Sequence, residues 1–259
     1  MKNIAWISNL VRVLVFAGFG LLASSTSLLA QSSGPSFFVG PIVGHNGVAY
    51  NTNVFGPPNS LPGFENTQNG TGGTQFAGVS AMFPLSTRFN NFFVVEVIYD
   101  SKSAPFTQMT RGTSYQIWTI SGESMSASLD YLLLNVGYKH NFFADSVMPS
   151  GLGVQLCASL GKTIRSKFTT VITDTENLSN GGSGPIQNGT SVTNIDGINA
   201  FRLAIRFDLT YDIPFFSRLI LTPSVGFDKP ITKVDNTSRN WWASSVYGAI
   251  ALRYAIGSF

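Results

Sequence analysis

Charged side chains recur at alternate positions between residues 201 and 211, and they are the first candidates for chemistry in this chain. Arg202, Arg206 and Asp208 share one side of this segment if it is extended, because strand side chains alternate between two faces. Apolar residues occupy the other side, with Phe201 at one end and Tyr211 at the other. Two cations and a carboxylate on one face can form buried ion pairs or line a path for ions.

The same alternation brings two more charges to the face that carries Arg206. Glu96 lies in the pattern of residues 91–101, and Arg253 lies in that of residues 242–256. An unpaired buried charge costs several kcal/mol, so charges that face a common interior must be paired. We therefore expect Glu96 and Asp208 to neutralise Arg206 and Arg253 as a packed lumen cluster, with a conducting path as the alternative. The predicted cluster consists of Glu96, Arg202, Arg206, Asp208 and Arg253.

Eight segments carry this period-two pattern, and their length suits strands that cross a bilayer at a tilt. Many of their apolar faces end in aromatic residues, as in the interfacial girdles of membrane barrels. The predicted strands are 36–45, 75–85, 91–101, 127–140, 151–163, 201–211, 218–228 and 242–256.

The connections between these segments alternate in length. Short ones are predicted at 86–90, 141–150 and 212–217, and long ones at 46–74, 102–126, 164–197 and 229–241. This alternation, with an even strand number, is typical of an outer-membrane barrel, whose closure leaves no unpaired strand edge. The predicted fold class is therefore all-β: a transmembrane up-and-down antiparallel β-barrel of 8 strands. A secreted β-sandwich is the alternative, but it gives no reason for the alternation.

Composition and the N-terminal segment agree with this fold class. Charged residues make up 11% of the 259 residues, well below the roughly 25% of soluble domains. Residues 1–30 carry Lys2 and Arg12 and then an apolar run, which predicts a cleaved signal peptide before a barrel domain at 31–259. Without these two cations, 14 basic residues face 13 acidic ones, so the sequence predicts no nucleic-acid partner.

Few other residues suggest chemistry. His45, expected at the external end of the first strand, could act as a general base in an enzyme that modifies lipid, although no partner is specified by spacing. His140 is expected at the opposite rim, so the two cannot share a metal. The single Cys157 forms no intramolecular disulfide, and we expect no cofactor, no metal site and no catalytic residue. Aromatic residues of the loops could contact a partner or belong to the external girdle: Tyr115, Trp118, Trp241 and Trp242.

The order of local patterns resembles the PorT-like outer-membrane β-barrel family. The likeness rests on four stretches, although Asn135 stands where the family commonly has proline: Val39–Asn46, Phe83–Ser86 with Val94–Tyr99, Leu129–Lys139, and Gly151–Gln155 with Leu160–Lys162. It implies a barrel in the outer membrane of a Gram-negative bacterium related to Bacteroidetes. Family members mostly have no assigned activity, and some are linked to protein secretion or gliding.

The C-terminus departs from the usual barrel pattern. Phe259 ends the sequence, but the apolar set that includes Tyr254 and Ile256 lies one residue out of phase with it. A bend near Gly257 could reconcile the two phases; without one, the interpretation of Phe259 as an assembly signal is weaker.

Taken together, these patterns lead to three functional hypotheses. The first is a non-enzymatic scaffold whose long loops bind an unidentified partner. The second is a small passive channel, and the third is the enzyme that uses His45. Expected partners are outer-membrane lipid, periplasmic chaperones and the barrel-assembly machinery.

Overall fold

The computed structural model describes residues 36–51, 70–111, 119–142, 148–176, 189–195, 197–235 and 241–257. The predicted signal peptide lies outside these ranges. In the part of the chain described, no helix is long and apolar enough to cross a membrane. The strands of the described part are β1 (Phe37–Asn51), β2 (Gly70–Pro84), β3 (Asn91–Arg111), β4 (Thr119–Asn141), β5 (Gly151–Glu176), β6 (Gly189–Asn194), β7 (Phe201–Phe216), β8 (Leu219–Pro230) and β9 (Trp242–Ile256).

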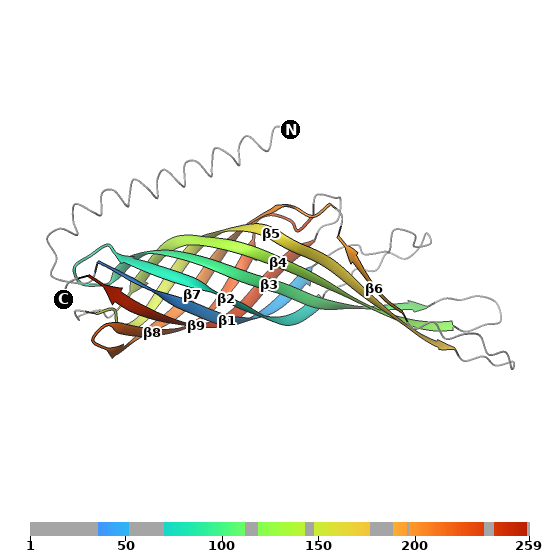
Figure 1. Ribbon diagram of the computed structural model, residues 1–259, viewed down its shortest axis with the longest axis horizontal. Helices are drawn as coiled ribbons and strands as arrows, with labels where there is room; N and C mark the ends of the chain where they lie inside the picture. The colour runs from blue at the N-terminus through green and yellow to red at the C-terminus, as the bar shows by residue number, and fades with distance from the viewer. Residues whose placement is uncertain are drawn as a thin grey trace, which may run out of the picture.

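Eight of these strands close into an antiparallel barrel, as Figure 1 shows. The order around the wall is β4, β3, β2, β1, β9, β8, β7 and β5, and a β4–β5 pairing closes the ring. The first and last strands pair directly, with Phe37 opposite Ile256. The predicted fold class is confirmed, and closure pairs the backbone around the whole wall, which hydrocarbon surroundings require.

Side chains alternate between the outer surface and the interior, as the sequence pattern predicts. On β7 the outward Phe201 and Tyr211 are 72% and 52% exposed, whereas the inward Arg206 is 5% exposed. On β9, the outward Tyr254 and Ile256 follow the predicted phase. The predicted bend is also present, because Gly257 has a φ of 123° in the left-handed region that favours glycine. Phe259 lies outside the described residues.

The two ends of the barrel differ. We call the end with the β2–β3, β4–β5 and β7–β8 connections the turn end, and the opposite one the loop end. Both ends of the described chain meet at the turn end, where the Ser36 amide donates to the Ile256 carbonyl at 2.7 Å.

Three of the long loops expected from the sequence are partly strands, which corrects the predictions for 46–74, 102–126 and 164–197. In the first, β1 continues to Asn51 and β2 begins at Gly70. The β3–β4 ladder continues to the pair Arg111–Ile120, and the β4–β5 ladder continues to Thr119–Glu176. The short β6 then pairs with β5 beyond the point where β7 begins. Figure 1 shows these strands projecting past the barrel at the loop end. Their Ser and Thr content indicated loops, but Thr also favours strands when a neighbouring strand is available.

Candidate functional site in the barrel lumen

Among the described residues, ten charged side chains face the lumen, and their formal charges cancel. Five carboxylates and five cations face inward, and each is at most 5% exposed. The sum of five negative and five positive charges is zero, so the filled interior needs no bound counter-ion. The members are Glu96, Asp100, Asp208, Asp212, Asp228, Lys102, Lys139, Arg202, Arg206 and Arg253.

Arg206 lies between two carboxylates at mid-height. Its Nη1 is 3.8 Å from Oε2 of Glu96, and its Nη2 is 3.3 Å from Oδ1 of Asp208. The guanidinium also lies 4.1 Å from the ring centroid of Tyr247. The Tyr247 hydroxyl donates to Oδ1 of Asp208 at 2.5 Å, so cation, ring and carboxylate hold one another in place.

Glu96 links this group to Arg253 on β9. Arg253 Nη2 lies 3.9 Å from Glu96 Oε1 and donates to the Ser80 hydroxyl at 2.9 Å. The Asn135 amide donates to the second Glu96 oxygen at 3.1 Å. Both arginines expected beside Glu96 are therefore found there, and neutral donors occupy its remaining hydrogen-bonding positions.

A second group lies nearer the loop end. Lys102 Nζ is 3.0 Å from an oxygen of Asp100 and 3.4 Å from one of Asp228. Asp228 also accepts a hydrogen bond of 2.7 Å from Arg202 Nη2. Arg202 was predicted to share one cluster with Arg206. It pairs instead with Asp228 of β8, closer to the loop end than Arg206.

A third group lies nearer the turn end. Lys139 Nζ donates to both oxygens of Asp212 at 2.6 Å. The Asn141 amide and the Thr222 hydroxyl donate to the same carboxylate at 2.8 and 2.7 Å. The Arg253 guanidinium donates to the Thr222 hydroxyl at 2.9 Å, which joins this group to the middle one.

Aromatic side chains cover the charges at the loop end. Trp241 is 0% exposed, its ring stacks on that of Phe168 at 5.9 Å, and it meets Tyr50 edge-on at 5.4 Å. The Tyr50 hydroxyl donates to the Lys102 carbonyl. We call Tyr50, Phe168 and Trp241 the loop-end cap. Trp241 is therefore a buried packing residue, which corrects its assignment as an exposed contact aromatic.

A second apolar cluster closes the turn end. Phe38 meets the rings of Phe89 and Phe92 edge-on at 6.0 and 6.2 Å. The cluster consists of Phe38, Met82, Phe89, Phe92, Val94, Met148, Ile220 and Ala255. The charged lumen therefore lies between apolar packing at both ends.

The remaining predicted residues lie apart from the lumen. Trp242 is half-buried on the outer face of β9, and Tyr115 and Trp118 lie outside the described residues. His45 points outward from β1, opposite Gln75 of β2. His140 contacts Asn91 at the turn end, at 2.8 Å, so the two histidines lie far apart on the barrel wall. Within the described ranges, no three His, Cys, Asp or Glu side chains are placed to hold a metal ion.

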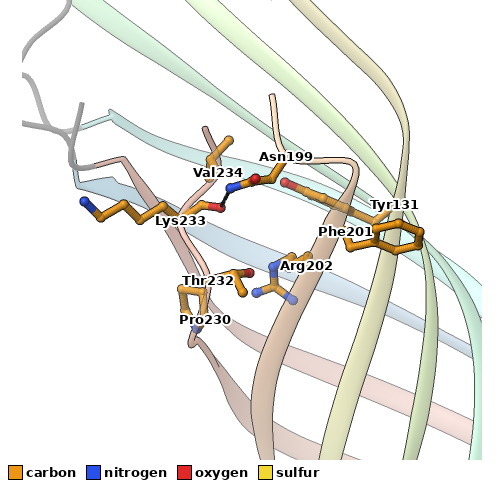
Figure 2. Close-up of a pocket in the computed structure, with 8 residues that line it drawn as sticks. All are labelled: Tyr131, Asn199, Phe201, Arg202, Pro230, Thr232, Lys233 and Val234. Carbon is orange, nitrogen blue, oxygen red and sulfur yellow. Dashed lines mark hydrogen bonds between the residues drawn. The ribbon is translucent and has the colours of Figure 1, made fainter. Parts of the chain in front are cut away.

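Figure 2 shows a narrow pocket beside Arg202 at the loop end. The Nε and Nη1 atoms of Arg202 are buried and have no hydrogen-bond partner among the described residues. Across the pocket, the Asn199 amide donates to the Lys233 carbonyl at 2.7 Å and fixes that wall. The pocket holds no space for a water molecule, so it does not serve as a ligand site in this conformation.

Sequence reasoning missed half of the charged set: Asp100, Lys102, Lys139, Asp212 and Asp228. Lys102 and Asp212 were assigned to connections, although period-two parity carried past the predicted strand ends would have placed both inside. The run Asp208, Thr210, Asp212 on β7 shows this directly, since each of the three is buried. Asp100, Lys139 and Asp228 lie on the inward face of predicted strands, so parity within those strands was already enough to find them. Lys102 and Asp212 require parity to be followed to the true strand ends.

Comparisons with known proteins add little to this site. No protein-family model and no curated protein matches the chain. Among solved structures, the chain is similar to Ail of Yersinia pestis at 5% identity and a TM-score of 0.33, covering 85% of this chain and 99% of that one. It is similar to Neisserial surface protein A at 13% identity and a TM-score of 0.31, covering 85% of this chain and 97% of that one. It is also similar to the outer membrane protein OprG from Pseudomonas aeruginosa, at 12% identity and a TM-score of 0.35, covering 88% of this chain and 100% of that one. At these scores the likenesses carry no argument, and the fold assignment rests on the strand pairing itself.

Proposed function

We propose that this chain is a closed outer-membrane β-barrel that conducts no ions and serves as a non-enzymatic scaffold for its loop-end sheet. The observation that carries the proposal is the filled lumen, where ten paired charges lie between apolar packing at both ends. An eight-stranded barrel encloses an interior just wide enough for side chains to fill. A packed interior makes the barrel wall rigid, and a rigid wall is sufficient for a scaffold that holds a sheet at its loop end.

The outer surface supports a membrane location. Outward residues of the wall are apolar over most of their length, such as Leu209, Val225 and Ile250, which are all more than 40% exposed. Aromatic residues stand near both ends of this surface, for example Phe201 at the loop end and Tyr254 at the turn end. Exposed apolar surface of this extent is stable in lipid and unstable in water.

The family resemblance supports a more specific cellular location. The PorT-like patterns place the chain, by our proposal, in the outer membrane of a Gram-negative bacterium of the Bacteroidetes type, with a link to protein secretion or envelope integrity. In this orientation the loop end is extracellular, and the turn end is periplasmic.

The channel and enzyme hypotheses receive less support. A passive channel requires a continuous water path, which the packed ion pairs of the lumen oppose. The enzyme requires a hydroxyl and a carboxylate beside His45, and the outward neighbours given by its register are Gln75 and Gly248. If His45→Ala abolished lipid turnover by the purified protein, the non-enzymatic proposal would be wrong.

The projecting strands are the surface through which a scaffold of this shape would act. Binding residues are commonly carried on segments that a rigid framework positions. Here β3, β4 and β5 extend the barrel wall as a sheet, and an edge of such a sheet can pair with an extended partner segment. We expect the partner to contact this loop-end sheet rather than the barrel wall.

Shortening the β3–β4 hairpin tests this proposal. Residues 106–125 are replaced by Asn-Gly, which joins the facing residues Pro105 and Ser126 by a tight turn and keeps the barrel register. We expect the variant to keep the heat-modifiable gel mobility of a folded barrel and to lose the proteins that crosslink to the full-length chain in cells. An unchanged set of crosslinked proteins would contradict the proposal.

A further inference from the structure

The outer surface at the loop end carries a group of exposed cations. Lys162 and Arg165 point outward from β5, and Lys229 points outward from β8. Lys162 lies opposite Phe201 in the register, and Lys229 is the next outward residue after Phe227. The cations therefore lie beside the aromatic residues at the loop end of the outer surface, with the exposed Ile164 and Ile231 next to them. We take this level to be the one where a bilayer changes from hydrocarbon to headgroups.

Among the described side chains, Arg165 pairs with a carboxylate, whereas Lys162 and Lys229 do not. Of the acids at this end whose side chains the structure describes, Asp130 and Asp235 lie outside the lumen set, and they are 1% and 3% exposed. Asp130 accepts hydrogen bonds from the hydroxyls of Tyr99 at 2.7 Å and Ser101 at 2.9 Å. It also binds Nε of Arg165 at 2.7 Å, while the Arg165 side chain remains 51% exposed. Asp130 thus fixes Arg165 in place and balances its charge, and the net positive charge of this surface comes from Lys162 and Lys229.

A hollow adjoins Arg165. It has a volume of about 310 Å³ and lies between residues 163–166 of β5 and the residues Ile195, Gly197, Ile198 and Ala200. Arg165 and Ser166 contribute polar atoms to one wall, and Ile195 and Ile198 contribute apolar surface to the other. A guanidinium beside a partly apolar hollow suits a headgroup that has both a phosphate and a hydrocarbon attachment, because guanidinium binds phosphate oxygens in pairs.

We propose that Lys162, Arg165 and Lys229 bind the phosphate groups of an anionic lipid in the outer leaflet. This inference rests on the membrane location proposed above. The three cations lie on one side of the barrel, across β5, β7 and β8. The outward positions of β1 and β2 at the same end are neutral or hold the single His45. The bound lipid is therefore expected on the β5–β8 side.

The test uses full-length protein in nanodiscs of phosphatidylcholine that contain a small fraction of lipid A, either bis-phosphorylated or fully dephosphorylated. Lipid that remains bound after purification is counted by native mass spectrometry. We expect the wild type to retain the phosphorylated form at least tenfold more than the dephosphorylated form. Each surface cation near a phosphate contributes about a fivefold preference, so Lys162→Gln/Arg165→Gln/Lys229→Gln should lose most of it.

Two matched variants control for charge and position. Lys162→Arg/Arg165→Lys/Lys229→Arg keeps the charges and should keep the preference. Arg88→Gln removes an exposed cation from the turn at the other end and should leave it unchanged. Equal retention of both lipids by the wild type, or full retention by the glutamine variant, would overturn the proposal.

A competition arm separates a lipid from free phosphate. Inorganic phosphate at 10 mM, against chloride at equal ionic strength, should not displace the bound lipid, because the free ion lacks the hydrocarbon part. Specific displacement by phosphate would overturn the lipid as the natural ligand. Heat-modifiable mobility of each variant shows separately that the barrel is folded, so failure of the membrane location and failure of the lipid site are distinguishable.

Discussion

Lys139 on β4 and Asp212 on β7 form an ion pair across the lumen, with Nζ 2.6 Å from both carboxylate oxygens. The residues are 73 positions apart, and their strands are not neighbours, because β5 lies between them. Both side chains are 0% exposed. The ion pair therefore connects two strands that do not hydrogen-bond to each other, and it does so through the interior of the barrel.

Removing one partner of this pair should destabilise the barrel strongly. Lys139→Met leaves the Asp212 carboxylate buried without its cation, and breaking a buried pair in this way costs about 3–5 kcal/mol. Lys139→Met/Asp212→Asn removes the stranded charge and should recover part of the loss. Urea unfolding in detergent micelles measures the four free energies of this double-mutant cycle, and strictly additive effects would show that the pair is not coupled.

The barrel wall should tolerate added volume at the outward Gly248 and not at the inward Gly44. A Cβ on Gly44 would lie 2.3 Å from the Phe76 ring and 2.6 Å from the Gly248 carbonyl oxygen, whereas a Cβ on Gly248 meets nothing within 4 Å. Gly44→Ala should therefore lower the free energy of unfolding by about 1–3 kcal/mol. Gly248→Ala should leave it unchanged or slightly raised. Equal effects of the two substitutions in urea titrations would contradict the packing described for Phe76.

The loop-end cap should contribute more to stability than its sequence neighbour on the outer face. Trp241→Ala opens a cavity between Tyr50 and Phe168, and such substitutions cost about 3–5 kcal/mol. Trp242→Ala changes an outward side chain and should cost clearly less. A stability loss in Trp242→Ala that matches or exceeds that in Trp241→Ala would show that the cap has been misassigned.

Strand parity and loop alternation were sufficient to predict the barrel, because both follow from one face contacting lipid and the other a polar interior. The eight wall strands lie where they were predicted, and Gly257 has the positive φ expected of a bend after Tyr254 and Ile256. Strand ends were harder to predict. The Ser- and Thr-rich continuations of β4 and β5 form strands because they pair with each other, and such a partner is not visible in the local sequence.

Half of the candidate site was predicted, and uncertain strand ends explain only part of what was missed. Asp100, Lys139 and Asp228 lie on the inward face of predicted strands and were overlooked there. Glu96, Arg206 and Arg253 lie well inside predicted strands, so parity alone put them in the lumen. Lys102 and Asp212 lie beyond the predicted strand ends. Lys102 meets Asp228 across the lumen and Asp212 meets Lys139, and both contacts depend on the register of the whole barrel. Trp241 faces the interior and Trp242 faces outward, although they are adjacent in the sequence. This difference can be assigned only when the start of β9 is known.

Cys157 offers a direct probe of water in the lumen. It is the only cysteine of the chain, it points inward, and its side chain is buried beside the middle charge group, opposite Arg206. A small cationic methanethiosulfonate should react with it slowly in the folded barrel and rapidly after unfolding in urea. Cys157→Ser/Lys167→Cys moves the thiol to an exposed position of β5 and should react rapidly in both states. Rapid modification of native Cys157 would indicate a hydrated lumen.

Ion conductance across a planar bilayer tests the closed lumen most directly. The wild-type protein, first shown to be folded by its heat-modifiable gel mobility, should leave the bilayer silent at all voltages that the membrane withstands. Glu96→Ala and Arg206→Ala, which remove members of the middle charge group, should conduct more than the wild type if they fold. Steady, stepwise conductance of the wild type would contradict the closed barrel and identify the protein as a channel.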